Sequence, residues 1–145
     1  MPNSSDTQNT NMNRLLITSL MIFALTTMCE GVFWGITHVK VINGLEPQSD
    51  VIAHCRSKDD DIGVIQLRHN DSFQFQFRPN FWKKTLFYCS FVWPGQVQWF
   101  DIFKHSRDDC KFCTWSVRTG GPCMYNYTAE TFDRCFKWNK KNPVY

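Results

Sequence analysis

The sequence lacks the residue patterns that mark common catalytic sites. Its 145 residues contain neither a Gly-rich phosphate-binding loop nor a G-x-S-x-G nucleophile motif. The four histidines show no metal-ligand spacing. His54 precedes Cys55, but adjacent residues of a strand point to opposite faces and are not placed to form a Cys–His catalytic pair. We therefore predict a protein that is not an enzyme and has no catalytic residue, bound metal or cofactor.

Long basic runs are also absent. The chain has 16 Lys and Arg against 13 Asp and Glu, and its longest basic runs are the pairs Lys83-Lys84 and Lys140-Lys141. A nucleic-acid-binding surface needs a dense basic patch or stripe, so we do not expect nucleic acid as a partner. The mildly basic balance is consistent with solubility and with an acidic partner surface or a cell wall.

A third absence is a hydrophobic run long enough to cross a membrane. Residues 15–28 are uncharged and mostly apolar, but they are too few, since a spanning helix needs about 20 apolar residues. They are typical of the hydrophobic region of a secretory signal peptide, preceded by Arg14 and followed by a plausible cleavage point near Gly31.

This leader sets the expected domain boundaries. We predict a signal peptide at residues 1–31 and a single secreted, extracellular domain at residues 32–145, with no membrane span after cleavage. The polar segment before the apolar run is long, so Met12 is an alternative start to Met1. An uncleaved membrane anchor is the other interpretation of the same residues.

Helical periodicity long enough for a strand–helix–strand unit is missing after the leader. Residues 72–78 alternate instead, with Phe73, Phe75 and Phe77 on one face, which is typical of a strand with one buried face. Residues 85–93 contain no Gly, Pro or charge and are rich in aromatic residues, which predicts a central strand. Further strands are predicted at 36–42, 51–56, 62–68, 97–103, 113–118, 123–127 and 135–138, with one turn of helix as an option at 130–133. About eight or nine short strands with frequent turns predict an all-β fold, a small antiparallel sandwich.

Cysteine gives the strongest compositional signal. Of the seven cysteines, Cys29 lies in the leader, and the other six are Cys55, Cys89, Cys110, Cys113, Cys123 and Cys135. An even number of cysteines in a short secreted chain predicts a disulfide framework, whose pairing sequence alone leaves open. Cys89 lies on the aromatic face of its strand and could tie that strand to a second sheet.

Two clusters have alternative interpretations that we consider less favoured. Cys110-Lys-Phe-Cys113 is a CxxC, but a redox motif of this kind opens a helix, whereas this one lies between a polar loop and a Trp-containing strand. A structural zinc site shows two close ligand pairs, and only one is present. The run from Asp59 to Asp61 could bind calcium, but its spacing is not that of an EF-hand and a solvated loop is favoured.

Two surface features remain. Asn70 and Asn126 each begin an N-x-S/T sequon, and both are therefore predicted to be exposed and glycosylated. Most tryptophans fall in predicted strands, whereas Trp82 lies in a connection beside Lys83 and Lys84. An exposed Trp beside charge is a typical interface contact.

An ordered set of short motifs runs through most of the predicted domain. The motifs are Val39-Lys-Val-Ile-Asn-Gly-Leu45, His54-Cys55-Arg-Ser-Lys-Asp-Asp-Asp-Ile-Gly63, Phe73-Gln-Phe-Gln-Phe77, Thr85-Leu-Phe-Tyr-Cys89, Trp93, Phe100-Asp-Ile-Phe103, Arg107-Asp108, Cys110-x-x-Cys113-x-Trp115, Gly121-Pro-Cys123 and Cys135-x-x-Trp138. Each motif is weak alone, but the ordered set resembles the plant self-incompatibility protein family, also called S-protein homologues.

The resemblance implies a small secreted β-sandwich that is held by disulfides and has no known enzyme activity. Some members are stigma-secreted signals that pollen recognises in self-incompatibility. This chain carries Cys110 and Cys123 beyond the family's four-cysteine core pattern, which implies a third bridge. The pairs expected on this basis are Cys55–Cys135, Cys89–Cys113 and Cys110–Cys123.

The function implied is that of a secreted ligand that binds a cell-surface receptor or another extracellular protein. Loops held by rigid strands commonly carry such contacts. The expected contact residues are Arg56, Lys58, Asp59, Asp60, Asp61, Trp82, Lys83, Lys84 and Arg107. Alternatives are a secreted defence or cell-wall protein that binds glycan and, ranked last, a hydrolase such as a ribonuclease.

Overall fold

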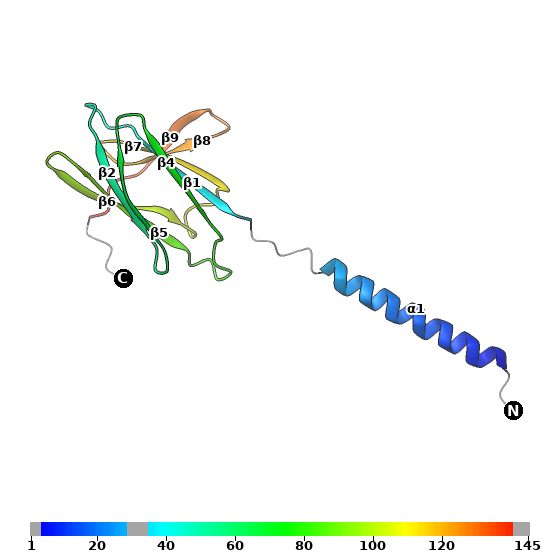
Figure 1. The fold of residues 1–145 in the computed structure, drawn as a ribbon. Helices are drawn as coiled ribbons and strands as arrows, with labels where there is room; N and C mark the ends of the chain where they lie inside the picture. Colours follow the sequence, from blue (N-terminus) through cyan, green and yellow to red (C-terminus); the bar gives the residue numbers. More distant parts are fainter. Residues whose placement is uncertain (1–3, 29–34, 141–145) are drawn as a thin grey trace. The chain divides into compact units, whose positions relative to one another are not determined.

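The computed structural model describes residues 4–28 and 35–140, which form a helix and a β domain (Figure 1). These belong to two separate compact units. The helix, α1, runs from Ser4 to Met28 and contains the apolar run of the leader. Within the described ranges, no helix combines the length and apolar character needed to cross a membrane. The predicted cleavage point near Gly31 and the leader cysteine Cys29 lie outside the described residues.

The β domain is a sandwich of two sheets, which confirms the predicted fold class. The strands are β1 Thr37–Asn43, β2 Val51–Arg56, β3 Asp61–Leu67, β4 Ser72–Phe77, β5 Leu86–Trp93, β6 Gln96–Lys104, β7 Phe112–Val117, β8 Cys123–Asn126 and β9 Thr131–Cys135. One sheet has the order β4-β1-β7-β8-β9 and the other has the order β3-β2-β5-β6. Most of the predicted strands agree with these bounds to within a residue or two.

One strand pair departs from the predicted antiparallel arrangement. β1 and β7 are parallel, with Val39 opposite Cys113 and Val41 opposite Trp115. The reason is topological. β6 ends beside the start of β5, and the connection after it crosses to the other sheet at the end where β1 begins. β7 therefore enters that sheet in the same direction as β1.

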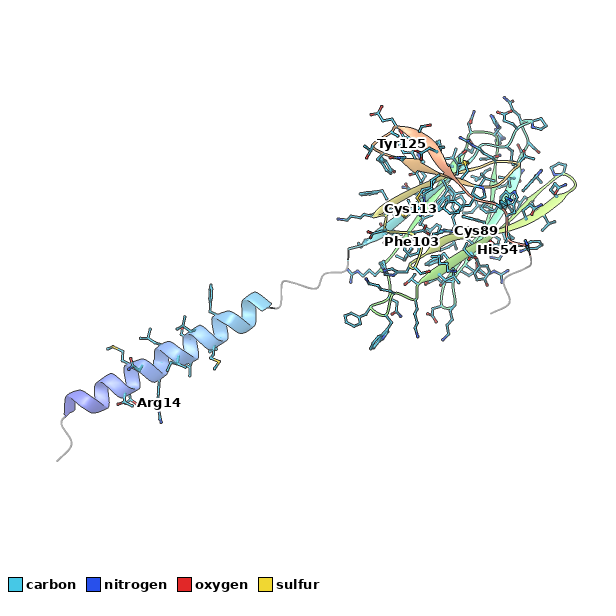
Figure 2. The ribbon with its side chains drawn as sticks, turned by 180° about the vertical axis from the view of Figure 1, so that it is seen from behind. Arg14, His54, Cys89, Phe103, Cys113 and Tyr125 are labelled. Carbon is cyan, nitrogen blue, oxygen red and sulfur yellow. A yellow bond between two sulfur atoms is a disulfide. The ribbon has the colours of Figure 1, made fainter. Side chains whose placement is uncertain are left out.

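The core lies between the sheets and follows the period-two pattern of the strands (Figure 2). In β5 the buried positions are Phe87, Cys89 and Phe91, which is the face expected from the sequence. Trp115 of β7 is completely buried in the opposite sheet. The three alternating phenylalanines of β4 stack along the strand, and Phe77 contacts Phe87 with ring centroids 4.4 Å apart. Each fully buried large apolar side chain contributes about 1.5–3 kcal/mol.

The C-terminal region differs from the prediction. Residues 131–135 form a strand where a helical turn was an option, and 136–140 are not a strand. Residues 131–135 are extended because they pair with β8, with Met124 opposite Arg134. Trp138 instead packs on Phe91 and Trp93, at 5.7 Å between ring centroids in each case, and its Nε1 donates to Thr119 O at 3.0 Å. The segment therefore closes one side of the sandwich.

The disulfide pairing also corrects the expectation. The bridges are Cys55–Cys89, Cys110–Cys113 and Cys123–Cys135, so the three expected pairs are wrong. Cys55 and Cys89 lie directly opposite each other on β2 and β5, with Cα atoms 4.0 Å apart. Cys123 and Cys135 are opposite in the same way on β8 and β9, at 3.9 Å. Strand register thus brings cysteines of the same sheet together, and none of these bridges joins the two sheets.

Candidate functional site

Three loops that are distant in sequence meet at one end of the sandwich. β2 and β5 are antiparallel with Arg56 opposite Tyr88, so the 57–60 loop leaves β2 where the 78–85 loop enters β5. Leu86 lies opposite Lys104, which places the start of the 105–111 loop at the same end. We call residues 57–60, 78–85 and 105–111 together the loop end. Its 78–85 loop lies at the lower edge of the domain in Figure 1.

The 78–85 loop presents two aromatic side chains to solvent. Phe81 is 61% exposed and Trp82 is 73% exposed, against 2% or less for Phe87 and Trp115 in the core. The two exposed rings meet edge to face, with centroids 5.4 Å apart and planes at 89°. Trp82 was predicted as an exposed contact, whereas Phe81 was missed. Its signal in the sequence is an aromatic residue that lies outside any alternating run.

Asn80 organises this loop. Its side-chain oxygen accepts the Trp82 backbone N–H at 2.7 Å, and its carbonyl accepts the Lys83 N–H at 3.0 Å. Its own N–H donates to Thr85 Oγ1 at 2.5 Å. Asn side chains that bond to the backbone two residues ahead stabilise tight turns. Phe81 and Trp82 are therefore held at the tip of a hydrogen-bonded turn.

Opposite charges flank this tip. Arg78, Lys83 and Lys84 are exposed in the 78–85 loop, which contains no acidic residue, and Lys104 is exposed on the neighbouring β6. The 57–60 loop is acidic and closes on itself, because Ser57 N donates to Asp60 O at 2.8 Å. A surface with adjacent charges of both signs favours partners whose charges are arranged in the complementary way.

Asp61 is held at the start of β3 by two donors. Gly63 N donates to Asp61 Oδ1 at 2.8 Å, and His54 Nε2 lies 2.7 Å from the same oxygen. The Gly63 N–H first, and His54 second, lower the pKa of Asp61 below its ordinary value of 3.8. The Asp61 carboxylate turns toward these groups and the Asp60 carboxylate toward Ser57 Oγ at 3.2 Å. The Asp60 and Asp61 carboxylates therefore do not converge on a common point.

Arg107 does not belong to the exposed contact surface, contrary to the prediction. Its guanidinium donates twice to the Asp108 carboxylate, at 2.7 Å each, and once to Asp101 O at 2.6 Å. It also lies over the rings of Phe100 and Trp115, at 4.8 and 5.2 Å from their centroids. Its side chain is only 20% exposed and that of Asp108 is fully buried. The Arg107 side chain thus packs against the interior of the domain and is not presented to a partner.

The two sequons occupy different environments. Asn70 is exposed in the turn between β3 and β4 with φ of 68°. The Asn126 side chain is half-buried, with Nδ2 donating to Asp133 at 2.9 Å and Oδ1 accepting the Thr128 N–H at 3.0 Å. The structure therefore offers the Asn70 amide to solvent and uses the Asn126 amide within the β8–β9 turn.

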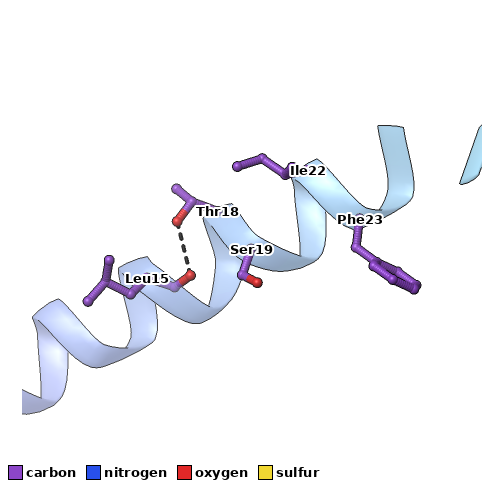
Figure 3. Close-up of a pocket in the computed structure, with 5 residues that line it drawn as sticks. All are labelled: Leu15, Thr18, Ser19, Ile22 and Phe23. Carbon is purple, nitrogen blue, oxygen red and sulfur yellow. Dashed lines mark hydrogen bonds between the residues drawn. The ribbon is translucent and has the colours of Figure 1, made fainter. Parts of the chain in front are cut away.

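A shallow hollow lies on the surface of α1. It is lined by Leu15, Thr18, Ser19, Ile22 and Phe23 (Figure 3). Thr18 Oγ1 donates to Leu15 O at 3.0 Å, so this hydroxyl already bonds to the backbone of its own helix. Among residues 4–28 and 35–140, no three His, Cys, Asp or Glu side chains are grouped to hold a metal ion. The loop end is the candidate functional site.

Comparisons with known proteins agree with this fold. The sequence profile described as plant self-incompatibility protein S1 matches residues 38–138. S-protein homolog 29 of Arabidopsis thaliana is 37% identical over 127 residues, which cover 86% of this chain and 94% of that protein. S-protein homolog 2 of the same plant is 40% identical over 109 residues, covering 70% of this chain and 68% of that protein.

A solved structure shows the same fold. It represents self-incompatibility protein homologues, described as a widespread family of small, highly stable, secreted plant proteins. The match has a TM-score of 0.50 at 15% identity and covers 77% of this chain and 92% of that one. From the profile match and the relatives, the chain belongs to the plant self-incompatibility protein S1 family.

Proposed function

We propose that the protein is a secreted extracellular ligand that recognises a protein partner at a cell surface through its loop end. The observation that carries this proposal is the convergence of the loops, which exposes Phe81 and Trp82 beside Lys83 and Lys84. The solved homologue is described as secreted, which supports an extracellular location for this chain. A role in signalling, including rejection of self pollen, is the finer form of the proposal.

The structure suggests how the loop end would work as a ligand. Trp82 and Phe81 supply apolar area to bury on a partner, and exposed aromatic residues of this kind dominate the energies of many interfaces. The basic 78–85 loop and the acidic 57–60 loop would set the orientation and the rate of association more than the affinity. The disulfide-bonded sandwich keeps the ends of both loops in place.

Binding of fluorescently labelled protein to plant cell surfaces tests the proposal. Replacing Lys83 and Lys84 with Glu should weaken binding about tenfold, and Trp82→Ala should weaken it about 30-fold. The matched control is Lys137→Glu with Lys140→Glu, two exposed lysines of the C-terminal segment. Pretreating the cells with protease should remove the binding. Equal binding by the Lys83/Lys84 variant and the wild type would exclude the 78–85 loop from the site.

The intact mass of the secreted protein tests the extracellular part of the proposal. We expect an N-terminus near Val32, the mass deficit of three disulfides, and sugar on Asn70. Deglycosylation followed by peptide mapping would locate the sugar. Free thiols together with an intact leader would contradict a secreted ligand.

A further inference from the structure

The tip of the 78–85 loop combines two features: adjacent exposed aromatic side chains, and a hydrogen-bonded turn that holds them in place. Phe81 and Trp82 are among the most exposed large apolar side chains of the β domain, and they are adjacent. They are held on a turn whose backbone N–H groups bond to Asn80. Two adjacent side chains this exposed offer apolar area on the outer surface of the domain. This area therefore fits an extended partner surface better than a small molecule.

The ring geometry argues against a sugar platform. The planes of Phe81 and Trp82 are at 89° to each other, so the two rings do not form one flat face on which consecutive sugars could stack. Both rings remain more than half exposed in this arrangement, so each offers apolar surface to a partner. Trp is also the residue that prefers the boundary between lipid tails and headgroups, because it has an apolar body and a polar N–H.

Within the 78–85 loop itself the charge has one sign, although the neighbouring 57–60 loop carries Asp59 and Asp60. Arg78, Lys83 and Lys84 lie within the same loop, and Lys104 follows on the adjacent strand end, opposite Leu86. Long basic side chains can extend their charged heads to phosphates while their stems lie along apolar surface. Each basic residue near an anionic membrane contributes about 1 kcal/mol, equivalent to about a fivefold change in affinity.

We propose that this tip docks on the interface of a phospholipid membrane that carries anionic headgroups. Phe81 and Trp82 insert between the headgroups, and Lys83 and Lys84 contact the phosphates. The inference rests on the proposed function, in which the loop end faces a cell surface. It reassigns Phe81 and Trp82 from the protein partner to the lipid and leaves the 57–60 and 105–111 loops for that partner. The acidic 57–60 loop opposes close approach on its own side, so the tip enters first.

Co-sedimentation with vesicles tests this without any receptor. The purified secreted protein should bind vesicles of phosphatidylcholine mixed with phosphatidylglycerol and should bind much less to phosphatidylcholine alone. Lys83→Gln with Lys84→Gln should weaken binding about 30-fold, from two charges near the surface. Trp82→Ala should weaken it about tenfold or more through lost apolar contact. Asp59→Asn should strengthen it, because one repulsive charge is removed.

Two controls distinguish insertion of the tip from general attraction. Tyr127→Ala removes a side chain that is 57% exposed in another loop, and Lys137→Gln with Lys140→Gln removes the same charge elsewhere. Both should leave binding unchanged. With brominated lipids, wild-type tryptophan fluorescence should be quenched. Trp82→Phe should still sediment with the vesicles but lose most of that quenching.

The outcomes separate this inference from the proposed function. Failure to bind anionic vesicles, or equal loss in the control variants, overturns the membrane inference. Binding to polygalacturonate at the same tip, with no vesicle binding, also overturns it in favour of an acidic polysaccharide. If vesicles are not bound but the Lys83/Lys84 variant still loses protease-sensitive cell binding, the protein-recognition proposal stands alone.

Discussion

The interior between the two sheets and the loop end use the same residue types for opposite purposes. Inside, Trp115 is completely buried and Arg107 is satisfied by a buried carboxylate and by aromatic rings. At the loop end, Trp82 is 73% exposed and Lys83 and Lys84 face solvent. In this fold, an aromatic or basic residue can therefore be assigned to stability or to recognition only when its burial is known. The contrast also predicts that mutations in the two regions affect different measurements.

The largest expected contrast is between the two tryptophans. Trp115→Ala should lower the free energy of unfolding by about 4 kcal/mol, because it leaves a large cavity beside Phe100. Trp82→Ala should change it by less than about 0.5 kcal/mol, as is usual for surface substitutions. Urea denaturation followed by circular dichroism measures both. A destabilisation by Trp82→Ala close to that of Trp115→Ala would break the comparison.

The disulfides should also rank by position. Replacing Cys55 and Cys89 with Ala should cost about 4 kcal/mol, since that bridge closes a long loop and both residues are buried. Replacing Cys110 and Cys113 should cost about 2 kcal/mol, because only three positions separate them. Denaturation under non-reducing conditions measures the difference. Equal losses would show that chain closure does not determine the ranking.

The buried ion pair gives a third contrast with the exposed lysines. Asp108→Asn should destabilise the domain by about 3 kcal/mol, because the Arg107 guanidinium would keep its desolvation cost without a counter-charge. Lys83→Gln with Lys84→Gln should be neutral for unfolding to within about 0.5 kcal/mol while weakening cell binding. Thermal unfolding and the binding assay, run on the same samples, separate the two effects.

The smallest expected effect is at Asp61, on the edge of the loop end. Its pKa is lowered in the folded state, so the charged carboxylate adds stability above about pH 4, which is lost as the pH falls through the lowered pKa. Asp61→Asn should therefore remove part of the acid-induced loss of stability and little else. Unfolding curves between neutral and acidic pH measure this. An identical pH dependence in the variant would exclude Asp61 as a contributor.

The sequence predicted the strands well where the pattern is local. Phe73, Phe75 and Phe77 alternate with polar residues, and β4 forms where that alternation occurs. It predicted Trp82 as exposed because no alternating run includes it. It failed at β9, where five residues become a strand through pairing with β8 and no pattern of their own requires it. It also placed Arg107 on the surface, because an arginine in a polar loop does not reveal the aromatic rings above which it lies.

The sequence by itself determined the family, the all-β class, the approximate strand bounds and the presence of a disulfide framework, since these depend on ordered motifs and on short-range alternation. Only the tertiary structure decided which cysteines pair, which strands run parallel, and which charged residues are buried. The physical reason is that these properties depend on register between segments far apart in the chain. Cys55 meets Cys89 because two strands align, and the loop end exists because several strands finish at the same place.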